Sequence, residues 1–261
     1  MAASAFTLKS STWRKRAAEH SGGNGPEPRS TNDLDLFLRP ELLIESEKLK
    51  PKAEAIARLG YQVVPGAENY QFVKPGSGGG ADVGSVKIDI LTGPQSRFKG
   101  TKVRADARRA RPNPSIGIHA HPVDEALTLE DGLLPIVLSG VLSSGESSEA
   151  EIFLPHPFTF SMMKLFAFRD RLGDADKDFG RYHALDLYTI LATTTEDEWG
   201  YALTLRDQNR DQPGIIEAGR LVEEHFSAID RLGMIRLRES PYYRPELRLD
   251  DFMPALQELF P

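Results

Sequence analysis

The chain has 261 residues, of which 40% are hydrophobic and 27% are charged, and its formal net charge at pH 7 is −6. These proportions are ordinary for a globular protein, and the length allows one large domain or two modest ones. The negative charge argues against a generally cationic coat, so any contact with nucleic acid requires a local basic patch.

Two further features of the composition bear on location. The sequence contains no cysteine, which excludes disulfides and thiolate metal sites and fits a reducing compartment. Its longest strongly apolar stretch, residues 133–142, is interrupted by Pro135, Ser139 and Gly140 and is too short to span a bilayer. We therefore expect a cytoplasmic protein with no membrane partner.

The chain begins with a segment, residues 1–21, that carries four basic residues before its first acid, Glu19. It has no hydrophobic signal core, and we treat it as a separate N-terminal segment whose start is uncertain. Residues 22–28, Gly-Gly-Asn-Gly-Pro-Glu-Pro, are predicted to form a loop, because Pro26 and Pro28 disfavour a helix after the glycines.

Two segments, Arg29–Leu38 and Val86–Leu91, alternate polar and apolar residues with a period of two and are predicted as short strands. On each strand the apolar side chains face one way and the charged ones the other. If the two strands are neighbours, three carboxylates converge on one polar edge of a sheet. These are Asp33, Asp35 and Asp89.

Such a convergence of like charges is unfavourable without a counter-charge, because residues two apart on a strand lie only roughly 6.5 Å apart. A divalent cation removes the conflict, and Mg²⁺, or Mn²⁺, prefers hard oxygen ligands and is commonly shared with phosphates. The alternative is that the Asp-x-Asp pair binds no ligand and only makes an edge strand soluble.

Between these strands the pattern predicts a helix over 40–59, restarted or kinked at Pro51, then strands at 61–64 and 70–73 and a Gly-rich loop at 75–84. The loop lacks the Lys-Ser/Thr that follows a phosphate-binding glycine loop, so we interpret it as a hairpin connection. The order of elements indicates an α+β fold with a small mixed sheet.

A basic stretch follows, Arg97–Arg111, in which Asp106 is the only acid. Its cations could contact the phosphate backbone of a nucleic acid, and a solvated surface loop is the alternative. They are Arg97, Lys99, Lys102, Arg104, Arg108, Arg109 and Arg111.

His119 and His121 stand two residues apart, a spacing that places both imidazoles on one face of a strand. A metal hydrolase would need further ligands, for which only His156 and His183 are within reach in the sequence. We therefore interpret His119 and His121 as the polar end of a strand and not as a metal site.

The pattern changes near residue 155, after two further strands at 135–142 and 150–154. Helices are predicted over 158–171, over 177–192, from Glu196 with a Thr cap, over 213–232, and over 249–260. The expected domains are an α+β domain over 22–155 and a mainly helical domain over 156–261.

The string Arg29-Ser-Thr-Asn-Asp33-Leu-Asp35-Leu36, preceded by Gly22 and Gly23 and followed by Asp89, resembles the nucleotidyltransferase superfamily related to DNA polymerase beta. Its minimal and abortive-infection toxin-type branch is the most similar. The resemblance implies that the three aspartates hold Mg²⁺ against a nucleoside triphosphate such as ATP, with Ser30 and Thr31 at the nucleotide. The prolines after Gly22 and Gly23 depart from the family pattern, so phosphate binding by those glycines is not expected.

A second set of residues extends the resemblance, because toxin-type members carry a helical Lys, an Arg seven residues later, a basic-Asp pair and an Asp-Leu helix. The matching residues are Lys164, Arg171, Asp178 and, less directly, Asp186. Positions 164, 168 and 171 share one helical face, so Lys164 and Arg171 can point together. The alternative is a charged helix face on which these residues pair with one another.

These observations lead to three functional hypotheses. The first is a metal-dependent nucleotidyltransferase that transfers a nucleotide to a hydroxyl of an RNA end or a protein, as the toxin of a toxin–antitoxin pair with a cognate antitoxin. The second is a degenerate relative that binds a partner without catalysis. A metal hydrolase built on His119 and His121 is a third and weaker reading.

Overall fold

The computed structural model describes residues 33–67, 69–75, 85–142 and 144–261. The predicted nucleotide contacts Ser30 and Thr31 lie outside the described residues, as do Gly22, Gly23 and most of the Gly-rich loop. For Asp33 the description covers the backbone and not the side chain. The chain forms two compact units that divide after Leu127, and each is described by itself.

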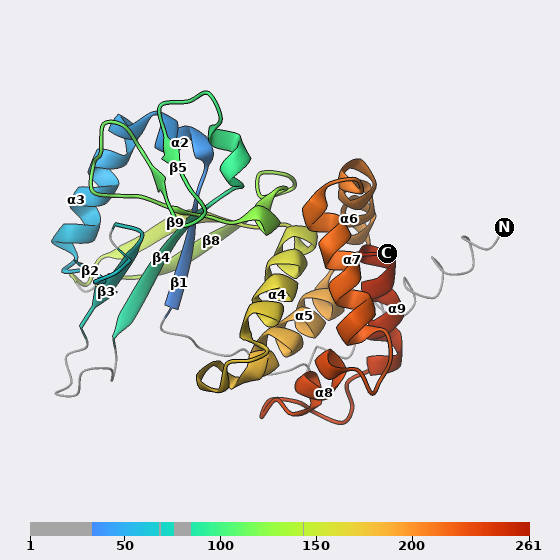
Figure 1. Ribbon diagram of the computed structural model, residues 1–261. Coiled ribbons are helices and arrows are strands. Elements are labelled where there is room, and N and C mark those ends of the chain that lie inside the picture. The colour runs from blue at the N-terminus through green and yellow to red at the C-terminus, as the bar shows by residue number, and fades with distance from the viewer. Residues whose placement is uncertain (1–32, 68, 76–84, 143) are drawn as a thin grey trace. The chain divides into compact units, whose positions relative to one another are not determined.

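The first unit is built on a small mixed sheet with the strand order β1-β4-β3-β2 (Figure 1). Strand β1 runs parallel to β4, while β3 is antiparallel to β4 and to β2. A short strand, β7, pairs in parallel with the end of β4. The strands are β1 (Asp33–Leu38), β2 (Gln62–Val63), β3 (Gln71–Lys74), β4 (Val86–Thr92) and β7 (His121–Pro122).

The predicted helix over 40–59 forms in three pieces, α2 (Pro40–Ile44), a 3₁₀ turn (Ser46–Leu49) and α3 (Lys50–Arg58). The restart expected at Pro51 is confirmed, since this proline occupies the first turn of α3, where its missing N–H costs no hydrogen bond.

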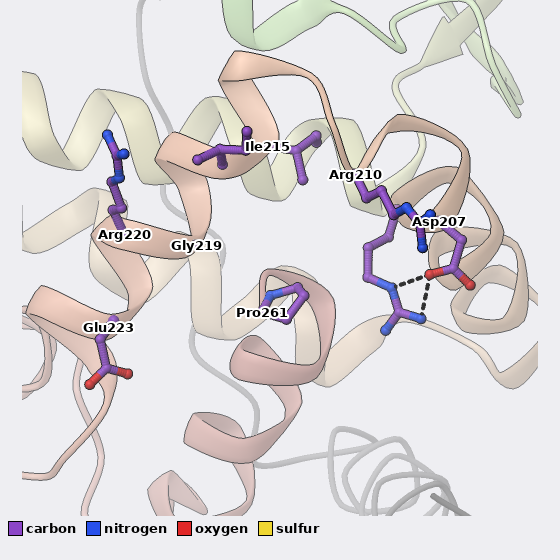
Figure 2. A pocket seen from close by; sticks show the side chains of 9 residues that line it. Asp207, Arg210, Ile215, Gly219, Arg220, Glu223 and Pro261 are labelled. Atoms are coloured by element: carbon purple, nitrogen blue, oxygen red, sulfur yellow. Dashed lines mark hydrogen bonds and ion pairs between the residues drawn. The ribbon is translucent and has the colours of Figure 1, made fainter.

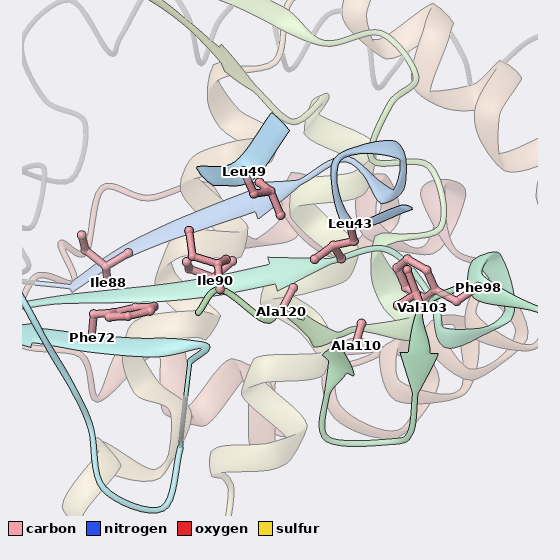
Figure 3. Close-up of a cluster of buried hydrophobic side chains, with 10 residues drawn as sticks. Leu43, Leu49, Phe72, Ile88, Ile90, Phe98, Val103, Ala110 and Ala120 are labelled. Atoms are coloured by element: carbon pink, nitrogen blue, oxygen red, sulfur yellow. The ribbon is translucent and has the colours of Figure 1, made fainter. Parts of the chain in front are cut away.

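One face of β4 supplies the centre of this unit's core. Ile88 and Ile90 are buried there with Leu43 and Leu49 from the helical segment, as Figure 3 shows. The alternation of β4 therefore leaves Lys87 and Asp89 on the opposite face.

Two 3₁₀ turns and a small hairpin complete the first unit. The basic stretch begins in the turn Gln95–Phe98 and ends in the hairpin formed by β5 (Arg104–Ala105) and β6 (Ala110–Arg111). Another 3₁₀ turn, Asp124–Ala126, precedes the division between the units.

The second unit contains the hairpin β8–β9 and a bundle of helices in which α4 and α5 lie side by side (Figure 1). Phenylalanines dominate the bundle core; the Phe168 and Phe226 ring centroids are 5.1 Å apart, and those of Phe158 and Phe260 are 5.4 Å apart. The elements are β8 (Leu134–Val141), β9 (Ser147–Leu154), α4 (Pro157–Arg171), α5 (Arg181–Thr193), α6 (Glu196–Asn209), α7 (Pro213–Phe226), α8 (Leu232–Arg238) and α9 (Leu249–Leu259).

The helix predicted over 177–192 is wrong at its beginning. Residues Ala175–Gly180 form a distorted 3₁₀ segment in which Asp178, Phe179 and Gly180 have φ angles of 55°, 51° and 76°. Left-handed backbone of this kind cannot continue a right-handed helix, so α5 begins only at Arg181.

The helix predicted over 213–232 is likewise too long, because α7 ends at Phe226 and a new helix, α8, begins at Leu232. The Thr195 cap of α6 is confirmed as a capping box with Glu198.

The units divide after Leu127, whereas the change in sequence pattern predicted a boundary near 155. One contact and the sheet topology account for the difference. Thr128 and Thr159 hydroxyl oxygens are 2.7 Å apart, which ties the segment before the hairpin to α4. The hairpin itself forms a separate two-stranded sheet and does not extend the sheet of the first unit.

Within the described ranges, no helix combines the length and the apolar character that crossing a bilayer requires.

Candidate functional site

The parallel pairing of β1 with β4 places two of the predicted carboxylates side by side. In this register Asp35 is the Cα partner of Asp89, and Asp33 is the partner of Lys87. Neighbouring strands lie about 4.8 Å apart. Asp35 is exposed and Asp89 is half-buried. The expectation that these strands are neighbours is confirmed, and their registration brings Asp35 and Asp89 to the same row of the sheet.

Strand β3 adds a third polar residue to this row. Gln71 is the Cα partner of Asp89 on the other side of β4, so the row reads Asp35, Asp89, Gln71 across three strands. Sequence reasoning missed Gln71, although the turn signal between β2 and β3 already indicated an antiparallel hairpin. The register of β3 against β4 could not be read from the pattern, because a connection as long as residues 76–84 is compatible with several registers.

The row offers carboxylate and amide oxygens, which are the donors that Mg²⁺ and Mn²⁺ prefer. The donor set therefore fits a hard divalent cation. Among the side chains that the structure describes, no group of three or more His, Asp or Glu residues is arranged to hold a metal. The third predicted ligand, the side chain of Asp33, lies outside that description.

In the second unit, the predicted basic residue Lys164 meets the less direct candidate, Asp186. The Lys164 Nζ lies 2.8 Å from an Asp186 carboxylate oxygen, joining α4 to α5. The side chains are 22% and 27% exposed, so water still reaches the pair. The Lys164 ammonium also lies 5.2 Å from the centroid of the Phe160 ring. This arrangement orients Lys164 toward α5 and fixes the position of its charge.

Arg171 and Asp178 each contact a near neighbour in sequence. Arg171 is exposed, with its guanidinium 3.9 Å from Asp174. Asp178 accepts a hydrogen bond of 2.5 Å from Arg181, which also donates to the Asp178 carbonyl oxygen. The Asp178–Arg181 contact stabilises the left-handed turn that precedes α5. The side chains of Lys164, Arg171 and Asp178 are thus paired with three different residues and not with one another.

The basic stretch is organised around its one acid. The Asp106 carboxylate accepts hydrogen bonds of 2.9 Å from the backbone N–H groups of Arg108 and Arg109. The first of these bonds is the main reason why the pKa of Asp106 lies below its ordinary value. Arg111 donates to the same carboxylate at 2.5 Å. Arg104 and Arg108 remain as exposed cations of this hairpin.

The two histidines of the hydrolase alternative differ in environment. His119 is buried, while His121 lies on β7 with its Nδ1 2.8 Å from the carbonyl oxygen of Arg108. The His121 ring is also 5.9 Å from the Tyr70 ring. One imidazole nitrogen of His121 is therefore directed at backbone, as expected for a polar strand end.

A cavity of about 760 Å³ lies between α6, α7 and the end of the chain (Figure 2). Three arginines line it, and each lies within ion-pair distance of a carboxylate, as in the Arg206–Asp207 pair at 2.7 Å. Gly219 packs closely here, because a Cβ at this position would lie 2.4 Å from the backbone oxygen of Pro261 and would force a local shift. The paired charges leave this cavity nearly neutral, which disfavours it as a triphosphate site.

The chain matches no protein family, and searches among curated proteins and solved structures likewise return no match.

Proposed function

We propose that the protein is a metal-dependent nucleotidyltransferase that transfers a nucleotide from a nucleoside triphosphate, such as ATP, to an acceptor hydroxyl. The observation that carries the proposal is the β1–β4 register, which makes Asp35 and Asp89 direct neighbours on adjacent parallel strands. Two like charges at this spacing favour a bound divalent cation.

In this proposal Asp33, Asp35 and Asp89 hold Mg²⁺ or Mn²⁺. The ions supply charge stabilisation to the triphosphate and to the acceptor oxygen. Asp35 and Asp33 face the triphosphate, and Asp89 faces the acceptor hydroxyl. In this proposal Gln71, the Cα partner of Asp89, donates an amide N–H to the Asp89 carboxylate or to the acceptor.

From the resemblance we assign Lys164 and Arg171 to phosphate contacts and Asp178 to the catalytic set, while Asp186 positions Lys164. The Lys164–Asp186 ion pair supports this for Lys164, because Asp186 holds its ammonium in one place and leaves the lysine side chain about one fifth exposed. A cation already oriented by a carboxylate loses less side-chain freedom when a phosphate arrives.

For the acceptor we propose an RNA end, contacted by the basic stretch Arg97–Arg111. Its support is the exposure of Arg104 and Arg108 on the β5–β6 hairpin of an otherwise acidic protein. A protein hydroxyl is the alternative acceptor. A cytoplasmic toxin held in check by a cognate antitoxin is the biological setting that this activity suggests.

A partner-binding protein without catalysis is the second candidate. It is favoured by the fact that Lys164 and Asp178 are both engaged by opposite charges, Asp186 and Arg181, within their own unit. On that reading the charges stabilise the helices and have no further role.

The test is labelling of total RNA by radioactive nucleoside triphosphates. We expect a labelled product, and a loss of more than about 100-fold, roughly 3 kcal/mol, in Asp35→Asn and in Asp89→Asn. Asp124→Asn is the matched control, since it removes an exposed carboxylate of the same unit away from the β1–β4 row. Undiminished labelling in Asp89→Asn contradicts its role, and triphosphate binding without any product supports the second candidate.

A further inference from the structure

The hairpin β8–β9 exposes apolar side chains along almost its whole length. Its two strands pair over eight residues each, and they form a sheet of their own within the described part of the chain. Val137 is 63% exposed and Phe153 is 55% exposed. A two-stranded hairpin is marginally stable alone, and a continuous exposed apolar surface marks an interaction site.

The register divides the hairpin into two unlike faces. Side chains that are directly opposite one another point to the same side, and successive pairs alternate. One side is entirely aliphatic up to Gly140, and we call it the aliphatic face. It comprises Leu134, Ile136, Leu138, Ala150, Ile152 and Leu154. The other side carries Glu149 and Glu151, opposite Ser139 and Val137, and we call it the acidic face.

The ladder also shows which edge of the hairpin is available for another strand. Leu142 donates a hydrogen bond of 2.8 Å to Glu146, which fixes the alternation of bonded and non-bonded pairs. The N–H groups of Ser147, Glu149, Glu151 and Phe153 then point away from β8. On the β8 edge the corresponding series includes Pro135, which has no N–H to donate. The β9 edge is therefore the better acceptor of a new strand.

The charges of this edge define its partner. Glu149 and Glu151 are two residues apart, and neither forms an ion pair or side-chain hydrogen bond with any residue that the structure describes. A strand laid beside β9 places its own alternate residues opposite these carboxylates, and its remaining residues beside the aliphatic face. Lysine or arginine opposite the glutamates, alternating with aliphatic residues, is complementary to both faces.

We propose that the β9 edge binds a partner protein through a strand in which basic and aliphatic residues alternate. This is strand addition, with backbone hydrogen bonds from Ser147 to Phe153 giving affinity and Glu149 and Glu151 giving specificity. The inference does not depend on catalysis.

A second copy of the chain is a poorer occupant. Antiparallel pairing of β9 with itself about Ala150 brings Glu149 of one copy opposite Glu151 of the other, and like charges directly opposite destabilise a sheet. Face-to-face packing of two aliphatic faces covers only about 300 Å² per copy, from roughly 27 Å of strand length and 10 Å of width, which is less than a stable interface needs.

The experiment measures binding of a fluorescent ten-residue peptide that alternates lysine and valine to the full chain, with a glutamate–valine peptide as the comparison. We expect the basic peptide to bind more tightly. The double variant Glu149→Lys/Glu151→Lys should weaken its binding at least about tenfold and reverse the preference. The control Glu54→Lys/Glu246→Lys changes net charge equally at exposed positions elsewhere and should change binding less than about threefold.

Amide hydrogen exchange gives a second readout of the same complex. The basic peptide should slow exchange at Ser147, Glu149, Glu151 and Phe153 and leave the inward amides of β9 unchanged. Equal binding of the two peptides, equal effects of the two double variants, or protection confined to other segments overturns the proposal. So does a dimer, seen by sedimentation, that Ile136→Lys on the aliphatic face dissociates. If Glu149→Lys/Glu151→Lys does not fold, Glu149→Gln/Glu151→Gln replaces it. Because glutamine carries no charge, this variant should lose the preference for the basic peptide without reversing it.

Discussion

Strands β1 and β4 bring two carboxylates together, whereas helices α4 and α5 bring an ammonium group and a carboxylate together. In the strand pair, Asp35 and Asp89 are Cα partners. In the helix pair, Lys164 and Asp186 are separated by 2.8 Å between charged atoms. The first arrangement follows from the register of the two strands, and the second from the packing of the two helices.

The two pairs have opposite electrostatic consequences. Lys164 and Asp186 neutralise each other, and a pair this accessible contributes no more than about 1 kcal/mol to stability. Asp35 and Asp89 carry the same charge, and in our proposal a divalent cation balances it. In our proposal the strand pair recruits a cation, whereas in the helix pair Asp186 holds the Lys164 ammonium in place, and the following predictions test that division.

The largest expected effect is at Lys164. If its ammonium serves the triphosphate, Lys164→Met should lower nucleotide labelling more than about 100-fold, because charge stabilisation of the transferring phosphoryl group is lost. The change in stability should stay near 1 kcal/mol. Labelling rates and melting curves measure the two effects separately.

Arg169→Gln is the control for this experiment, since it removes a neighbouring cation that contacts Asp170 and the Phe166 ring. It should retain labelling. A fully active Lys164→Met/Asp186→Leu variant would show that the helix pair is only structural.

The basic hairpin extends the comparison to the acceptor. Because Arg111 is held by Asp106, the exposed Arg104 and Arg108 should carry most of the contact with RNA. Arg104→Gln/Arg108→Gln should weaken RNA binding about tenfold and reduce the slope of log affinity against log salt by about two.

Filter binding at several salt concentrations measures this slope, beside a melting curve of each variant. Arg58→Gln, on α3, is a control that removes an exposed arginine of the same unit. An unchanged slope in the double variant would leave the hairpin as a solvated loop and favour a protein acceptor.

The strand pair predicts a smaller effect on stability. Mg²⁺ or Mn²⁺ at ten times its dissociation constant should stabilise the protein by about 1.4 kcal/mol and raise the melting temperature by about 3 °C. Asp33→Asn/Asp35→Asn should abolish the shift, while Asp124→Asn should retain it. The same shift in all three proteins would mean that the cation binds elsewhere.

The smallest expected effect is a loss of stability of the helical unit at acidic pH. His156 is buried at the start of α4, where its Nδ1 accepts a hydrogen bond of 3.2 Å from the Phe158 N–H. Burial lowers the pKa of His156 below its ordinary value of 6.5. The unfolded chain then binds the proton more readily, so stability is complete above about pH 6.5 and falls as the pH drops toward the folded-state pKa.

Melting temperatures between pH 7.5 and 5 measure this loss. His156→Asn keeps a capping acceptor that does not titrate, so its pH dependence should be shallower than that of the wild type. An identical dependence would assign the acid sensitivity to other groups, such as His225, whose pKa burial also lowers.

Patterns of short range predicted much of this molecule. Alternation located β1 and β4 and correctly assigned Ile88 and Asp89 to opposite faces, because the strand period of two depends on no distant contact. The restart at Pro51 and the capping box at Thr195 follow from local backbone chemistry, and both are present.

Features that depend on distant contacts could not be predicted. The pairing of Gln71 with Asp89 depends on how β3 registers against β4, and the Lys164–Asp186 contact depends on how α4 packs on α5. Helix propensity also did not reveal the left-handed residues before α5, since Asp178 and Phe179 rarely adopt that conformation.

The left-handed turn before α5 sets the rotational phase of that helix. Gly180 permits it, because a Cβ there would lie 3.0 Å from the Phe168 carbonyl oxygen, and its φ of 76° disfavours other residues. Each residue of an α-helix advances the side-chain direction by about 100°. Adding or deleting one residue between Gly180 and Asp186 would therefore turn the carboxylate about a quarter of the way around the helix, away from Lys164. Removing three or four residues would nearly restore its direction one turn lower, so natural length variants at this point should differ by whole turns.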